Sequence, residues 1–193
     1  MMLAGHFGVA GIVKAWRPDI PLAALLVATQ LPDLVFAPLA LAGWESMEPA
    51  APGLEGYGSL LITAEFSHSL LFNVVLALAV GWSVHVFLRD RWGRDAGAVV
   101  GAVVFSHWLL DLLVHRPDLP LLPGNVGDLP LWGLGLWEAP ALTAVVEGAL
   151  VLTGTGLYAW RTLRDEPRRV RAWCRSAAMA LLLVGAFVFD LLA

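Results

Sequence analysis

The sequence has little charge for its length and a single cysteine. Only 15% of its 193 residues are charged and 59% are hydrophobic, with a mean hydropathy of +0.74. In soluble globular domains about a quarter of the residues are charged, so this composition indicates a membrane protein, and the length suits one domain, residues 1–193. Cys174 alone cannot form an internal disulfide or a thiolate cluster. Any metal site must therefore use nitrogen and oxygen ligands.

Two further absences limit the class of protein. No basic residue precedes the apolar start MMLAGHFGVAG and no cleavage signature follows it, so we expect no signal peptide. A basic groove with interleaved aromatic platforms is also lacking, which argues against nucleic acid as a partner. The expected partner is the lipid bilayer.

The apolar runs predict an all-α fold, a polytopic transmembrane bundle of five spans and a short N-terminal helix. The N-terminal helix, 3–16, would be about 21 Å long, which is short for a span. In the first span Pro32 should kink the helix beside Asp33. Connections at 44–58 and 117–135 are rich in glycine and proline and should be irregular. The expected spans are 21–43, 59–88, 95–115, 137–160 and 176–193.

Basic residues are shared unevenly among the connections. Eleven of the 12 Lys and Arg lie in alternate connections: two at 14–17, three at 89–94 and six at 161–175. The other connections hold only Arg116 and several acids. The positive-inside rule predicts that the basic connections face the cytoplasm, in a multi-pass protein of the cell inner (cytoplasmic) membrane.

One apolar stretch, SHWLLDLLVHR at 106–116, carries ionisable side chains at helical spacing. His107, Asp111 and His115 are four residues apart and would lie on one face of a helix. Ionisable groups inside a membrane are costly and mark functional sites. A His and an Asp four apart on a helix can also chelate one metal ion.

Counting along each span places further polar residues at the same depth. At about 1.5 Å per residue, five side chains from four separate helices fall between the midplane and the outer interface. Imidazole nitrogens and carboxylate oxygens suit zinc, with manganese and iron as alternatives. We therefore expect a divalent metal ion held by His6, Asp33, His68, His107 and Asp111, with Ser67, Ser69 and Ser106 orienting the imidazoles.

Several of these residues have simpler interpretations. His85 lies near the opposite end of its span and is expected to be a packing residue. His107 and Asp111 could share an intrahelical hydrogen bond, and Asp33 could cap a broken helix. His115 is either a site residue or the end of its helix. The sequence does not assign Glu147.

The polar blocks resemble a known family when they are taken in order. GHFGVAG with His6, QLPDL with Asp33, FSHSLL with His68 and SHWLLDLL with His107 and Asp111 are similar to successive blocks of the YdjM-type membrane-bound metal-dependent hydrolases. That family is thought to be related to zinc-dependent phospholipase C, so the resemblance implies a helical site acting on phosphoesters. Family members commonly carry a second acid where this chain has Val35, which removes a ligand for a second metal.

These observations lead to one principal hypothesis and two alternatives. The first is a membrane-bound metal-dependent hydrolase with its site in the outer half of the bilayer, acting on a lipid or lipid-linked phosphoester. Its catalytic residues would be Asp33, His107 and Asp111, with Asp33 as a ligand or a general base. The alternatives are a transporter that moves protons or metal ions along the same residues, and a non-catalytic structural membrane protein.

Overall fold

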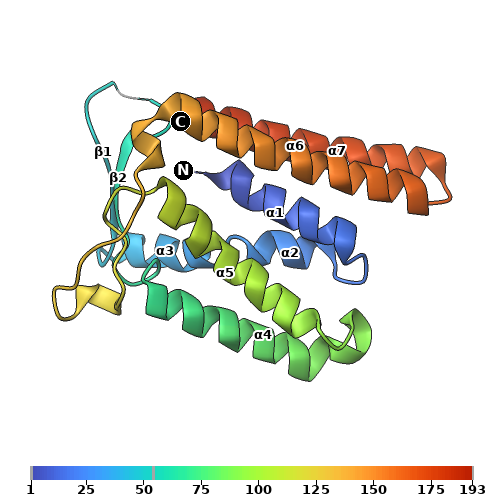
Figure 1. Ribbon diagram of the computed structural model, residues 1–193, viewed down its shortest axis with the longest axis horizontal. Helices are drawn as coiled ribbons and strands as arrows, with labels where there is room; N and C mark the ends of the chain where they lie inside the picture. Colours follow the sequence, from blue (N-terminus) through green and yellow to red (C-terminus); the bar gives the residue numbers. More distant parts are fainter. Residues whose placement is uncertain (1, 54, 193) are drawn as a thin grey trace.

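The protein is a bundle of helices with a short β-hairpin at one end (Figure 1). The computed structural model describes residues 2–53 and 55–192. It supports the predicted all-α class and adds a small two-stranded sheet. The elements are α1 (Leu3–Trp16), α2 (Leu22–Ala28), α3 (Leu31–Leu41), β1 (Ser46–Pro49), β2 (Leu60–Thr63), α4 (Leu70–Trp92), α5 (Ala96–Val114), α6 (Pro140–Asp165) and α7 (Arg169–Leu192), with 3₁₀ turns at Pro123–Asn125 and Leu136–Glu138.

The helices pack as two pairs joined through α1. α4 packs along α5, α6 packs along α7, and α1 contacts α5, α6 and α7. Gly8 of α1 lies so close to α6 that a Cβ there would come within 2.7 Å of the Leu150 carbonyl oxygen. Small residues at such crossings are typical of helices that associate in membranes.

The three basic connections lie together at one end of the bundle. Figure 1 shows the α1–α2, α4–α5 and α6–α7 connections at that end and the hairpin with both chain termini at the other. Arg17 links two of these connections, because its guanidinium pairs with Asp19 at 2.7 Å and with Asp95 at 2.9 Å. We call the two ends the arginine end and the hairpin end.

Among the described residues, four helices, α4, α5, α6 and α7, are long and apolar enough to cross a membrane. The first expected span, 21–43, for which a kink was predicted, is two helices, α2 and α3, bent by 50° at their junction. The prediction of five spans is therefore supported for four helices, and the bent pair is a broken span or a re-entrant segment. The predicted disruption is present, with Pro32 in the first turn of α3.

The segment 59–69 does not belong to the helix that the sequence predicted over 59–88. Leu60–Thr63 pairs antiparallel with Ser46–Pro49, so part of the expected loop 44–58 is also a strand. Helix α4 begins only at Leu70, where the Ser69 hydroxyl caps it by accepting a hydrogen bond from the Phe72 amide. His68 therefore lies in the loop before α4.

Two acidic side chains from distant helices cap the first turn of α1. The Ala4 amide donates to Asp190 of α7 and the Gly5 amide donates to Glu147 of α6, both at 2.8 Å. Both carboxylates are buried, and the Tyr57 hydroxyl also donates to Glu147. The first amides of a helix have no partner within it, so these contacts satisfy donors that would be costly to leave unpaired in an apolar region. They also fix the turn of α1 that carries His6.

Candidate metal centre

The five side chains predicted as metal ligands lie together at the hairpin end. They come from α1, α3, the loop before α4, and α5. Four of them are buried, whereas the side chain of Asp33 is 34% exposed. Two overlapping groups have ligand atoms close enough to share one ion: the first is His6, His107 and Asp111, and the second is Asp33, His68 and His107.

Four of the ligand atoms lie close together, two imidazole nitrogens and two carboxylate oxygens. Five of the separations among them measure between 3.0 and 3.6 Å. Around an ion with bonds of about 2.0–2.2 Å, tetrahedral geometry separates neighbouring ligand atoms by about 3.3–3.6 Å. The spacing therefore matches a coordination shell for one ion. The four atoms are Asp33 Oδ1, His68 Nε2, His107 Nε2 and Asp111 Oδ2.

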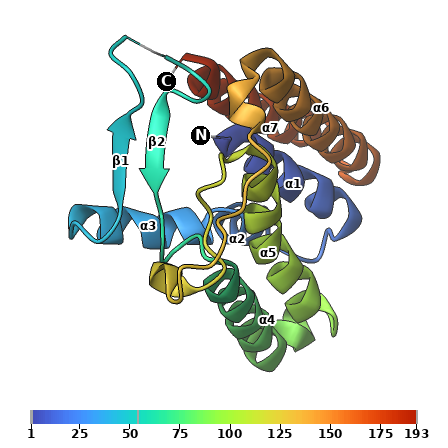
Figure 2. The same cartoon turned by 60° about the vertical axis from the view of Figure 1, so that its left-hand side comes forward.

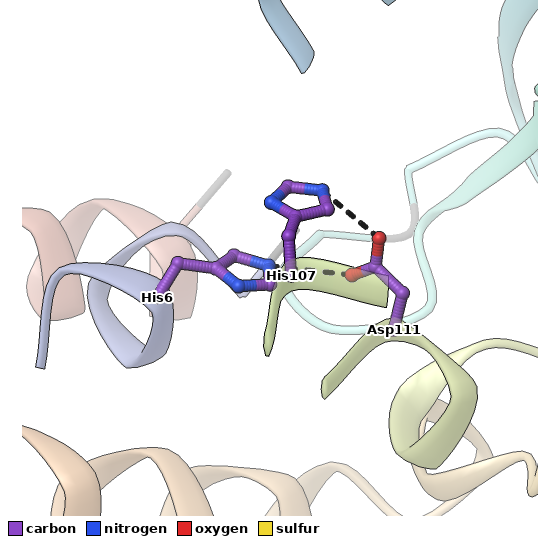
Figure 3. A group of neighbouring side chains, drawn as sticks. All are labelled: His6, His107 and Asp111. Carbon is purple, nitrogen blue, oxygen red and sulfur yellow. Dashed lines mark ion pairs between the residues drawn. The ribbon is translucent and has the colours of Figure 1, made fainter. Parts of the chain in front are cut away.

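Asp111 lies between the imidazoles of His6 and His107, and its Oδ2 is also 3.4 Å from His68 Nε2. Figure 3 shows its carboxylate facing the rings of His6 and His107, with Oδ1 at 3.3 Å from His6 Nε2 and Oδ2 at 3.0 Å from His107 Nε2. The rings of His6 and His107 are stacked, with their centroids 4.0 Å apart. Among the described residues, Asp111 Oδ2 and His6 Nδ1 are buried without a hydrogen-bond partner. A carboxylate oxygen in that condition is costly without a cation beside it, so the geometry fits a bound ion.

The break between α2 and α3 orients His107. The Nδ1 of His107 lies 2.7 Å from the backbone carbonyl of Thr29, the last residue before Gln30 at the break. A carbonyl only accepts, so Nδ1 carries the proton and Nε2 of the neutral ring presents a lone pair. Metal-binding histidines are commonly fixed in this way.

His68 is oriented by a pair of residues from the hairpin. Its Nδ1 lies 2.8 Å from the Ser67 hydroxyl, which donates at 2.8 Å to Glu45. Because the hydroxyl proton is engaged with the carboxylate, the hydroxyl accepts from Nδ1 of the imidazole, and Nε2 presents a lone pair. Glu45 is buried and also accepts from the amides of Phe66 and Ser67. Sequence reasoning did not find Glu45.

A small cavity lies against one side of the cluster. It has a volume of about 30 Å³, and its lining includes His6, Asp33, His68, Asp111 and His115. That is enough room for an ion or one water molecule. His115, which the sequence left undecided, is buried at the C-cap of α5, and its Nδ1 is 2.9 Å from Asp118.

Two of the three serines predicted to support the site, Ser69 and Ser106, do not contact the cluster through their side chains. Ser106 donates to the carbonyl of Val103, so Thr29, not Ser106, orients His107. Ser69 caps α4, as described above. His85 lines an apolar depression between α4 and α5, together with Gly81 and other residues of these helices. Only Ser67 contacts an imidazole of the cluster as predicted.

Comparison with known proteins identified no relative of this chain. No family model matches the sequence, and neither a curated protein nor a solved structure matches the chain. The resemblance to the YdjM-type hydrolases therefore rests on the order of the motif blocks in the sequence alone.

Proposed function

We propose that the protein is a membrane-bound metal-dependent hydrolase whose site is the cluster at the hairpin end. The observation that carries this proposal is the convergence of lone pairs. His68 and His107 each donate through Nδ1, so in the neutral rings both Nε2 atoms present lone pairs toward two carboxylates. In that state the atoms of like polarity, 3.0–3.6 Å apart in a buried region, favour a cation among them.

The ligand chemistry favours zinc, with manganese and iron as alternatives. His68, His107 and Asp111 would hold the ion, and Asp33 would be a fourth ligand. His6 holds the second oxygen of Asp111 and can serve as a further ligand. When bound, such an ion would activate water and polarise a phosphoryl or carbonyl oxygen.

Asp33 is the residue best placed to move a proton. It is the most exposed of the five, and it lines both the small cavity and a larger groove beside it. A carboxylate at the mouth of a buried site can accept a proton from water and pass it to solvent. The buried Asp111, held between two imidazoles, is suited to a fixed role as a ligand.

The membrane setting and the resemblance to YdjM-type proteins favour a phosphoester of a lipid or lipid-linked molecule as substrate. The positive-inside rule would place the arginine end in the cytoplasm and the cluster in the outer half of an inner membrane. A transport path would require ionisable groups that continue to the arginine end. The buried histidines and carboxylates of the described residues lie in the connections at the hairpin end or in the part of each helix nearest that end: His6, Glu45, His68, His107, Asp111, His115, Glu147 and Asp190. This distribution favours a site that opens at one end.

The experiment that tests the proposal measures metal content and hydrolysis together. Detergent-purified protein should contain about one ion per chain by mass spectrometry, and the ion should be lost in His107→Ala and in Asp111→Asn. His85→Ala is the matched control and should keep it. The metal-loaded protein should cleave a phosphoester lipid in nanodiscs, and Asp33→Asn should lose cleavage. Metal retained in both ligand variants would reject the site, and bound metal without cleavage of any phosphoester would reject the activity.

A further inference from the structure

A second, larger hollow lies directly beside the metal centre. It is a groove of about 920 Å³ between α3 and the start of the hairpin. Figure 2 shows α3 at the foot of β1 and β2. The α3 side of the groove is apolar, with Leu34, Ala37, Ala40 and Leu41 along its length. Its volume lies within the range of about 300–1,000 Å³ that is usual for small-molecule sites.

The groove adjoins the cavity of the metal centre. Leu3, Asp33, Phe36 and Met47 line both hollows. A molecule lying in the groove would therefore have one end next to Asp33 and the ligand atoms. The other end would run along α3, where Leu34 and Leu41 are 55% and 91% exposed.

A buried amide faces the groove without a partner. Gln30, at the break between α2 and α3, is 9% exposed and lines the groove. Its Nε2 has no hydrogen-bond partner among the described residues. An unpaired buried amide is costly, and a ligand oxygen within reach would satisfy it.

The lining indicates the chemistry of the occupant. The charged side chains in the groove are the acids Asp33, Glu45 and Glu48, so an anionic group is repelled there unless it lies against a bound cation. The apolar part offers few hydrogen-bonding partners, which suits a hydrocarbon chain. An extended protein segment would bring backbone groups that need partners.

We propose that this groove binds an acyl chain of a membrane glycerophospholipid, with Gln30 donating to an ester or phosphoryl oxygen of the same molecule. The phosphoester then lies beside Asp33 at the metal centre. The identity of the cleaved bond rests on the proposed function, whereas binding of the chain in the groove does not.

The test uses the full-length protein in nanodiscs that contain phosphatidylglycerol with a diazirine in its acyl chain. After illumination, peptide mass spectrometry should place the label on 30–48. Ala37→Trp fills the groove and should lower labelling there about tenfold or more, because a bulky side chain excludes the chain. Ala98→Trp puts the same side chain into the apolar depression between α4 and α5 and should leave labelling of the groove unchanged. Gln30→Leu should weaken labelling about threefold to tenfold through loss of one hydrogen bond.

Two further arms separate the groove from the activity. His107→Ala, which binds no metal, should keep part of the labelling in the groove, because the acyl chain still fits while the phosphodiester loses the cation that offsets the nearby acids. Labelling together with absence of hydrolysis in the wild type would reject the proposed function and leave the groove assignment standing. Hydrolysis with label spread evenly over the lipid-facing helices would overturn the groove assignment. Crosslinks between two copies of the chain through 30–48 would overturn it too. Ala40→Trp repeats the test if Ala37→Trp does not fold.

Discussion

The Nε2 atoms of His68 and His107 lie 3.3 Å apart, and neither bears a proton when its ring is neutral. Each ring has its Nδ1 proton committed elsewhere, to the Ser67 hydroxyl and to the Thr29 carbonyl. Two lone pairs at this distance, with carboxylate oxygens beside them, repel unless a cation lies among them. The stability of the hairpin end should therefore depend on that cation.

Removal of metal should lower the thermal stability of the wild-type protein. A ligand present at 100 times its dissociation constant stabilises the folded state by about 2.7 kcal/mol. A chelator should therefore lower Tm by several degrees in the wild type and leave Tm of His107→Ala unchanged. Differential scanning fluorimetry in detergent, with zinc added back, measures both. An equal shift in the two proteins would contradict the prediction.

Loss of Glu45 should weaken metal binding although Glu45 does not contact the ion. It orients the Ser67 hydroxyl, which in turn orients His68. Substitution of such supporting residues typically lowers metal affinity about 10- to 100-fold. Glu45→Gln should show that loss in a competition titration with a chromophoric chelator. Glu48→Gln, on the same hairpin but exposed, is the control.

Ser67→Ala tests whether Glu45 acts through Ser67. Because the two residues form one chain of hydrogen bonds, the double variant should lose little more affinity than either single variant. Additive losses would mean that Glu45 supports the site by another route.

Glu147 should contribute to stability through the first turn of α1. Replacing it with Leu leaves the Gly5 amide and the Tyr57 hydroxyl without their acceptor. A buried donor left unpaired costs about 1–3 kcal/mol. Unfolding in mixed detergent should show a loss of at least that size for Glu147→Leu and a smaller loss for Glu147→Gln, which keeps an acceptor oxygen. Equal stability of the two variants would rule out the capping role.

Tyr57 should make stability fall at high pH. Burial and the hydrogen bond to Glu147 raise the pKa of its phenol above the ordinary value. The unfolded phenol ionises near pH 10 while the folded one keeps its proton. Above about pH 10 the folded state therefore binds more protons than the unfolded state, and stability decreases as pH rises. Tyr57→Phe should reduce this slope in unfolding curves between pH 9 and about 11. An unchanged slope would contradict the assignment.

The sequence predicted the site better than it predicted the elements that carry it. The spacing of His107 and Asp111 defines one helical face, and that local regularity persists in α5. His68 lies beside His107 as predicted, but in a loop, because the apolar run Leu60–Thr63 fits a short strand as well as a helix. The pairing of Leu60–Thr63 with Ser46–Pro49 is a contact between separate segments, and it leaves no hydrophobic periodicity in the sequence.

Glu45 and the Thr29 carbonyl could not be predicted for a related reason. Glu45 acts on residues 21 and 22 positions later in the chain, through a loop whose path depends on the hairpin. The Thr29 carbonyl becomes available to His107 at a helix break, and a backbone atom has no sequence signature. Pro32 predicted the helix break, but not that His107 would donate a hydrogen bond to a carbonyl beside it.

Because the two ends of the bundle are well separated, labelling at one end can report the orientation of the protein in a membrane. Cys174, the single thiol in the sequence, is exposed on α7 near the arginine end. A charged maleimide that does not cross bilayers will react with it from one face only. Because the thiol lies away from the metal ligands, the label reports which side of a vesicle holds the arginine end without disturbing the cluster at the hairpin end.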